Sequence, residues 1–182
     1  MLRQTDISPL SRLVMRVDAA ADSGVPGDSF ATGFPSVDKW LGGGLRRGDL
    51  VVLGGEVGAG KSSLALAMSL RMAQAGISSA FFTAEMTVER VMERVLAIEG
   101  RARVDDIRNG TIDEATRAAV GAAAVRLRDG SPIIDNLPPG GVQTLADAVR
   151  RTLDVQVTFI DSLQALGLGQ DRKSTRLNSS HT

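Results

Sequence analysis

The segment GEVGAGKS at residues 55–62 constrains this chain more than any other, because it fits the pattern G-x-x-x-x-G-K-[S/T]. A loop whose backbone N–H groups all turn inward around a phosphate needs positive φ angles and a close approach of the backbone, which glycine accepts at low cost. Gly55, Gly58 and Gly60 are the residues that we expect to supply them. The pattern therefore predicts a phosphate-binding loop between a strand and a helix.

The residues on both sides of this loop support the same interpretation. The run DLVVLG at 49–54 is apolar and bounded by glycine, which predicts a buried strand. Residues 61–75 place Leu64, Ala65, Met68 and Met72 on one face and stop at Gly76, which predicts a helix. This context favours binding of a nucleoside triphosphate over the alternative, a glycine turn with a structural role only.

The loop and the first turn of the helix contain the residues expected to contact the nucleotide, which are Gly55, Glu56, Val57, Gly58, Ala59, Gly60, Lys61, Ser62 and Ser63. The helix N-terminus attracts the same anion through its partial positive charge. Lys61 is expected to reach the β and γ phosphates as a point charge, and the Ser62 hydroxyl is expected to hold Mg²⁺. The predicted cofactors are ATP and Mg²⁺.

The rest of the chain alternates between helical and strand patterns. Further strands are predicted at 79–83, 133–135 and 155–160, and helices at 7–21, 37–41 with Ser36 as its cap, 87–99, 113–128 and 144–151. Strands that alternate with helices imply right-handed crossovers and a mainly parallel sheet. The predicted fold class is three-layered α/β, with a linker helix and flexible linker at 1–29 and a core at 30–170.

Acidic residues follow the predicted strands at the edge where an open parallel sheet binds ligands. Asp161 is the candidate for holding Mg²⁺, and the alternative is a solvated loop acid. Glu85 could take a proton from the attacking water or orient it, and the alternative is an acid that favours the dipole of the following helix. Asp135 ends a shorter strand and is expected to be a turn residue or a helix-capping neighbour.

Composition excludes several kinds of chemistry. The 182 residues carry 21 basic and 21 acidic side chains, so the chain lacks the basic excess of a protein that coats nucleic acid. Without cysteine there is no disulfide or thiolate site, and the single histidine is His181. The sequence contains neither a signal-peptide core nor an apolar run near the roughly 20 residues that span a bilayer, so we expect a soluble, cytoplasmic protein without membrane contact.

The last residues, 171–182, differ abruptly from the Ala/Gly/Val-rich sequence before them. One interpretation is a disordered polar terminus. We favour another: the string DRKSTRLNSSHT resembles the conceptual translation of a sequencing-library adapter. On that hypothesis the native reading frame is represented only to about Gln170, and the protein is truncated at its C-terminus.

The order and spacing of several motifs resemble the C-terminal ATPase domain of DnaB-type replicative helicases, a RecA-like P-loop family. The resemblance covers about Thr32 to Leu166 and rests on the glycine run 42–44, the loop 55–62, FTAEM at 82–86 and FIDSLQ at 159–164. Arg94 and IRNG at 107–110 add the most discriminating part. Ser162 stands where the family usually has an aromatic residue, and Glu56 and the glycine run look more like the RadA and KaiC branch.

The resemblance implies a hexameric ring of identical subunits, with ATP at subunit interfaces and single-stranded DNA in the central channel. It implies that Glu85 and Lys61 are catalytic, that Ser62 and Asp161 hold the metal, and that Gln164 couples the γ-phosphate to DNA-binding loops. For Gln164, the alternative is an ordinary polar residue at a strand end. The DNA-binding loops and the arginine finger would follow Gln170, so this chain alone is expected to bind ATP and hydrolyse it very slowly.

Residues before Thr32 occupy the place of the family's linker helix. Leu10, Leu13, Val14 and Val17 would be its contact stripe on a neighbouring subunit, and the alternative is packing on its own domain. Two other functions stay open at this stage: a RadA- or KaiC-like ATPase in recombination or regulation, and a nucleotide-dependent assembly module without motor activity.

Overall fold

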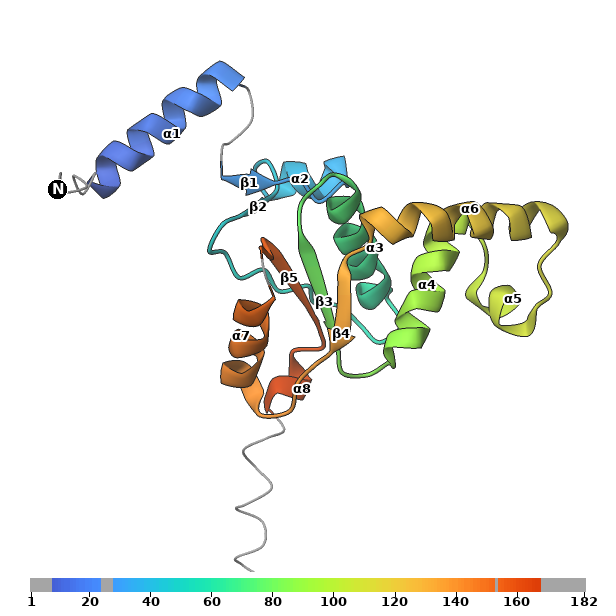
Figure 1. Cartoon of the computed structure of the whole chain (residues 1–182). Coiled ribbons are helices and arrows are strands. Elements are labelled where there is room, and N and C mark those ends of the chain that lie inside the picture. The colour runs from blue at the N-terminus through green and yellow to red at the C-terminus, as the bar shows by residue number, and fades with distance from the viewer. Residues whose placement is uncertain (1–7, 24–27, 153, 168–182) are drawn as a thin grey trace, which may run out of the picture. The chain divides into compact units, whose positions relative to one another are not determined.

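The computed structural model of the chain describes residues 8–23, 28–152 and 154–167 (Figure 1). The proposed non-native tail at 171–182 and part of the predicted linker lie outside these ranges. The chain divides into two compact units, Met1–Leu53 and Gly54–Thr182, which are described one at a time. The predicted domain boundaries at residues 29 and 170 stay predictions.

The N-terminal unit contains four short elements, α1 Pro9–Ser23, β1 Ser29–Phe30, α2 Pro35–Trp40 and β2 Leu45–Arg46. β1 and β2 pair antiparallel, with Phe30 opposite Leu45. Gly44 has φ of 120°, and a Cβ there would lie 2.4 Å from the Phe30 carbonyl oxygen. The glycine run therefore ends where β2 must approach β1 more closely than any side chain permits.

The predicted cap of the second helix is wrong. α2 begins at Pro35 with Phe34 as its N-cap, so Ser36 lies inside the helix. Proline suits a first helical turn because its φ is already helical and its missing N–H has no partner to lose there. Asp38 of α2 instead accepts hydrogen bonds from the backbone N–H and the hydroxyl of Thr32, at 2.8 and 2.7 Å.

The predicted strand at 49–54 is also wrong, because none of these residues is in a strand. The side chains of Leu50, Val51, Val52 and Leu53 are 83, 50, 67 and 46% exposed. A strand exists only through hydrogen bonds to a neighbouring strand, and no strand among the described residues pairs with this segment. An apolar run shows that a segment is suited to burial, but it does not show that another strand will pair with that segment.

The C-terminal unit alternates helices and strands after the glycine-rich loop. Its elements are α3 Lys61–Gln74, β3 Ser79–Thr83, α4 Val88–Gly100, α5 Val104–Asn109, α6 Glu114–Gly130, β4 Ile133–Asn136, α7 Gly141–Arg151, β5 Val157–Asp161 and α8 Gln164–Gly167. The three strands form a parallel sheet in the order β4-β3-β5. The predicted strands and helices within this unit are confirmed to within a few residues at their ends, whereas α5 and α8 were not predicted.

Helices cover both faces of this sheet (Figure 1). On one face, Ala80 and Phe82 of β3 form a buried cluster with Leu145 of α7. On the other, Ser79 hydrogen-bonds to Ser69 of α3, and Phe81 stacks on Phe159 of β5 with ring centroids 6.5 Å apart. All five residues of β3 are buried for this reason. The three-layer α/β class is therefore confirmed.

The buried face of α3 differs in part from the predicted one. Met72 is fully buried as predicted, but Leu66 and Leu70 are buried beside it, whereas Leu64, Ala65 and Met68 are half-buried. Apolar residues surround most of this helix, so their spacing does not define a single inner face. Packing of α3 against β3, β5, α4 and α6 decides it instead.

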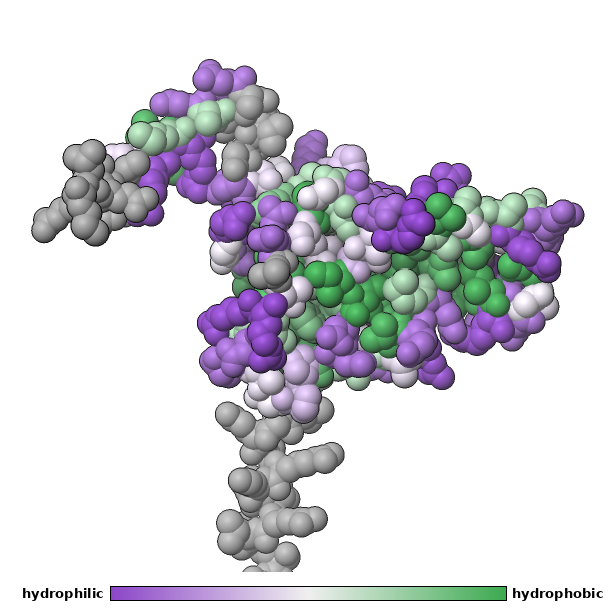
Figure 2. All heavy atoms as spheres, viewed as in Figure 1, coloured by the Kyte–Doolittle hydropathy of each residue, from purple (hydrophilic) through white to green (hydrophobic). Residues whose placement is uncertain are grey.

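Two helices, α4 and α6, begin at side-chain caps. Thr87 accepts from the Arg90 N–H at the start of α4, and Asp113 accepts from the Thr116 N–H at the start of α6. The backbone N–H of Thr116 lowers the pKa of Asp113 because it stabilises the carboxylate. Figure 2 shows the hydrophilic outer face of α7, which ends in Arg150 and Arg151.

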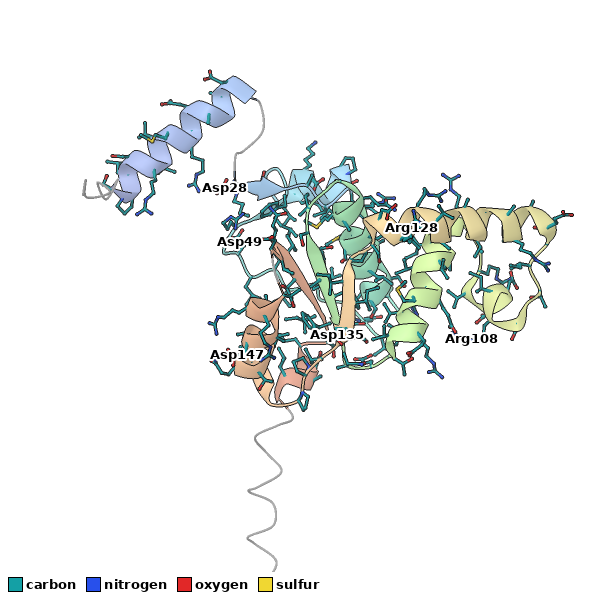
Figure 3. All side chains as sticks on the ribbon, in the orientation of Figure 1. Asp28, Asp49, Arg108, Arg128, Asp135 and Asp147 are labelled. Atoms are coloured by element: carbon teal, nitrogen blue, oxygen red, sulfur yellow. The ribbon has the colours of Figure 1, made fainter. Side chains whose placement is uncertain are left out.

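α5 is held against α4 by an ion pair. The Arg108 guanidinium lies 2.8 Å from the Glu93 carboxylate, and Figure 3 shows its side chain between the two helices. This hydrogen bond and the charge of Glu93 raise the pKa of Arg108.

The part of the chain that the structure describes contains no helix with both the length and the apolar character of a membrane span.

Candidate nucleotide-binding site

The glycine-rich loop leads directly into α3. Gly58 and Gly60 have φ of 81° and 87°, and Gly60 is the N-cap of the helix. A Cβ at either position would meet nothing within 4 Å, so the backbone conformation, and not space, requires glycine there. Gly55 does not have the predicted positive φ, and a Cβ there would make an ordinary 3.6 Å contact with Ala59. Its expected contact with the nucleotide stays a prediction.

The Lys61 ammonium group closes the loop on itself. Its Nζ donates to the carbonyl oxygens of Gly55 and Glu56, at 2.9 and 2.7 Å. The N–H of Ala59 also donates to the Glu56 carbonyl, at 3.2 Å. The lysine side chain therefore lies over the loop, within reach of a phosphate bound there. A phosphate oxygen would be a stronger hydrogen-bond partner for the ammonium group than these exposed, neutral carbonyls.

Asp161 contacts Ser62, the last residue of the loop motif, although the two residues lie 99 positions apart in the sequence. The Ser62 hydroxyl, in the first turn of α3, donates to Oδ1 of Asp161 over 3.0 Å. Asp161 is the last residue of β5 and is half-buried, so it is not a solvated loop acid. The parallel sheet therefore brings together the two residues predicted to hold the metal.

The second carboxylate oxygen of Asp161 provides a test of whether Mg²⁺ fits. Oδ2 is buried, and among the described residues it has no hydrogen-bond partner. An unsatisfied buried carboxylate oxygen is costly, and Mg²⁺ or one of its waters would satisfy it. Mg²⁺ commonly takes one or two protein oxygens and completes its shell with phosphate and water. Ser62 and Asp161 fit that requirement.

Glu85 lies in the turn between β3 and α4, and hydrogen bonds of the neighbouring residues hold the backbone of this turn in place. The buried Thr83 hydroxyl donates to the Met86 carbonyl over 3.1 Å and accepts from the Met86 N–H over 3.2 Å. The Ala84 N–H donates to the Asp161 carbonyl over 2.7 Å. Because Thr87 caps α4, Glu85 precedes the helix and does not belong to its first turn.

Ser162 contacts Glu85 directly. Its hydroxyl donates to Oε1 of Glu85 over 3.0 Å, between residues 77 positions apart. The sequence interpretation included Ser162 only as a departure from the family pattern and missed this contact. The available signal was its place directly after a strand-end aspartate, beside the strand that carries Glu85.

Two other candidates lie apart from these hydrogen bonds. Gln164 begins α8 and is exposed, so its proposed coupling role stays a prediction. Asp135 is in β4, where its carboxylate accepts from the Asn136 N–H over 2.7 Å (Figure 3). The expectation of a turn residue or a helix-capping neighbour is wrong, because Asp135 lies within β4, which continues to Asn136.

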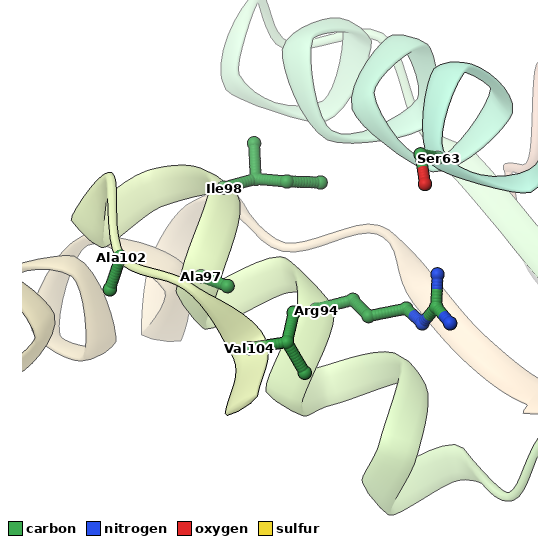
Figure 4. Close-up of a pocket in the computed structure, with 6 residues that line it drawn as sticks. All are labelled: Ser63, Arg94, Ala97, Ile98, Ala102 and Val104. Atoms are coloured by element: carbon green, nitrogen blue, oxygen red, sulfur yellow. The ribbon is translucent and has the colours of Figure 1, made fainter. Parts of the chain in front are cut away.

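Ser63 lines a shallow cavity beside the first turn of α3. The cavity has a volume of about 200 Å³, and its other lining residues are Arg94, Ala97, Ile98, Ala102 and Val104. Figure 4 shows the Arg94 side chain extending from α4 to the neighbourhood of Ser63. A guanidinium group therefore lies near the N-terminal end of α3, where it adds positive charge to the side of the loop.

Comparison with known proteins gives one family and a set of longer relatives. The family model for the DnaB-like helicase C terminal domain matches residues 29–180. The replicative DNA helicase DnaB of Treponema pallidum is 29% identical over 137 residues, which are 73% of this chain and 31% of that protein. The DNA repair protein RadA of Escherichia coli is 38% identical over 65 residues, which are 36% of this chain and 14% of that protein.

A solved structure of an ATPase domain agrees with the fold. It matches with a TM-score of 0.73 and 18% identity, over 88% of this chain and 58% of that one. This likeness agrees with the three-layer α/β fold. The chain spans about a third of the DnaB sequence that it matches. The family match includes most of segment 171–182, whose non-native origin stays a prediction.

Proposed function

This chain belongs to the family of the DnaB-like helicase C-terminal domain, and from that premise we propose that it is the ATP-hydrolysing motor of a replicative DNA helicase. One observation carries the proposal. Ser62 of the glycine-rich loop and Asp161 of β5 meet at 3.0 Å, and the buried Oδ2 of Asp161 is left without a partner among the described residues. A magnesium ion bound to a triphosphate would supply the partner that Oδ2 of Asp161 lacks.

The chain's own groups have separate tasks in this proposal. The loop N–H groups and the N-terminus of α3 bind the phosphates, and Lys61 exchanges its carbonyl partners for the β and γ phosphate oxygens. Ser62 and Asp161 would hold Mg²⁺, which neutralises charge on the phosphates when bound. The Glu85 carboxylate orients the attacking water and accepts its proton.

The whole protein is proposed to act as a ring. ATP would lie between subunits of a homo-oligomeric hexamer, single-stranded DNA would pass through the centre, and Gln164 would link the γ-phosphate to DNA-binding loops. Support comes from the family and from relatives named as replicative helicases, of which this chain spans a part. The expected site of action is the cytoplasm.

A RadA-like ATPase is the second candidate, because the 65-residue stretch of higher identity matches a DNA repair protein. The two candidates differ in how they use DNA. A replicative helicase translocates along single-stranded DNA and unwinds a forked duplex at the expense of ATP. Unwinding of a fork by the complete gene product supports the helicase, and ATP hydrolysis without unwinding supports the second candidate.

The nucleotide site is tested by binding and turnover in matched variants. Lys61→Ala should weaken Mg·ATP binding by at least about tenfold in calorimetry, since it removes a charged phosphate partner. Lys39→Ala is the control, because Lys39 is an exposed lysine of α2. Glu85→Gln should bind normally and lose about 10²- to 10⁴-fold in turnover of the complete gene product. Normal binding by Lys61→Ala would refute the phosphate site.

A further inference from the structure

The hydroxyl of Ser162 is directed at the carboxylate that the proposed function uses to orient water. It donates to Oε1 of Glu85 over 3.0 Å. We propose that Ser162 is a positioning residue for Glu85, and that its hydrogen bond holds this carboxylate in the orientation needed for hydrolysis. The inference rests on the proposed role of Glu85 and adds the residue that sets its geometry.

The backbone that carries Glu85 is already fixed by other contacts. Thr83 lies opposite Asp161 in the β3–β5 register, and the Ala84 N–H donates to the Asp161 carbonyl over 2.7 Å. The Thr83 hydroxyl closes the turn through both polar groups of the Met86 backbone. None of these bonds restrains the Glu85 side chain, which rotates about several bonds and loses conformational entropy when it is ordered.

Ser162 supplies the missing restraint from a rigid support. It directly follows β5, whose register with β3 runs from Val157 to Asp161. Its hydroxyl occupies Oε1, and among the described residues Oε2 of Glu85 has no hydrogen-bond partner. One oxygen is therefore anchored, and the other is left to accept a hydrogen bond from water.

A helix-capping role does not account for the Ser162 hydroxyl. The turn that begins α8 uses the backbone carbonyl of Ser162, which accepts from the Ala165 N–H over 3.1 Å. The hydroxyl instead crosses to the neighbouring strand end, to a residue 77 positions away. Its contact is thus independent of the start of the helix.

The position of Ser162 also links Glu85 to the metal side of the site. Asp161 accepts from the Ser62 hydroxyl over 3.0 Å, and the next residue, Ser162, donates to Glu85. Two successive residues at the end of β5 therefore contact the phosphate loop and the glutamate. A displacement of this strand end would move both groups together.

The experiment compares Ser162→Ala and Ser162→Thr in the complete gene product, with kcat and KM for Mg·ATP as the readout. Ser162→Ala should lower kcat about three- to tenfold, as expected for the loss of one hydrogen bond to a charged group, and leave KM within about twofold. Ser162→Thr keeps the hydroxyl and should restore most of kcat. In a Glu85→Gln background, Ser162→Ala should have no further effect, because the two residues act as a pair.

Each outcome addresses one of the two proposals. Unchanged kcat in Ser162→Ala, with turnover lowered about 10²- to 10⁴-fold in Glu85→Gln, would overturn the role of Ser162 and leave that of Glu85 intact. An equal loss in the Glu85→Gln background would also overturn it, because Ser162 would then act elsewhere. Full turnover in Glu85→Gln would remove the proposed role of Glu85 itself. If Ser162→Ala does not fold, Ser162→Cys, a weak donor of similar size, should show the same loss of kcat.

Discussion

At the scale of single residues, the glycine-rich loop and the start of α3 combine two separate requirements. Gly58 and Gly60 are needed for their left-handed backbone, with open space around both positions. Lys61 and Ser62 are needed for their polar groups, which contact loop carbonyls and Asp161 respectively. Conformation and chemistry in this loop can therefore be tested by different substitutions.

Gly60→Ala should lower the free energy of unfolding by about 1 to 2 kcal/mol, the cost of a left-handed conformation for a residue with a Cβ. The matched control is Gly55→Ala, because Gly55 is outside the left-handed region and its added Cβ would make only ordinary contacts. Urea denaturation without nucleotide gives both values. Equal midpoints for the two variants would show that the φ of Gly60 carries no cost.

At the scale of elements, α4 and α6 pack through a glycine. A Cβ at Gly100, the last residue of α4, would lie 2.7 Å from Val120 Cγ2 and 3.1 Å from the Val120 Cα in α6. The second distance involves backbone, which cannot rotate away. The approach of these two helices thus depends on the absence of a side chain at one position.

Gly100→Ala should destabilise the protein by about 1 to 3 kcal/mol, because the added methyl group forces the helices apart. Gly121→Ala, in α6, has nothing within 4 Å of its added Cβ and should stabilise the helix by about 0.5 to 1 kcal/mol. Thermal or urea unfolding distinguishes the opposite signs. Destabilisation by both variants to the same extent would contradict the packing argument.

At the scale of the whole molecule, α1 carries a stripe of exposed apolar side chains. Leu10, Leu13, Val14 and Val17 are 68, 45, 50 and 57% exposed. Their helical spacing forms one stripe, and a stripe of this kind on a surface helix is typical of a contact surface. In the proposed ring, this stripe docks on a neighbouring subunit.

Leu13→Asp should reduce self-association of the complete gene product in the presence of Mg·ATP and leave the affinity for Mg·ATP unchanged. A charge in the middle of an apolar contact is costly to bury. Arg12→Asp places the same charge on the opposite side of α1 and serves as the control. Sedimentation velocity measures the assembly, and an unchanged oligomer in Leu13→Asp would refute docking through this stripe.

The sequence by itself determined the glycine-rich loop before α3, the alternation of helices and strands in the C-terminal unit, and the acids near the strand ends. These features depend on local spacing and on the backbone demands of glycine, which are visible within a few neighbouring residues. The same local information wrongly predicted a strand at 49–54, because an apolar run does not reveal whether another strand will pair with it.

Only the tertiary structure decided which groups meet. The Ser62–Asp161 and Ser162–Glu85 hydrogen bonds join residues 99 and 77 positions apart. The first depends on the packing of α3 beside β5, and the second on the parallel register of β3 and β5. A shift of either would separate a pair without changing a local pattern in the sequence. The inner face of α3 was decided in the same way, since packing on several elements selects among the apolar faces of one helix.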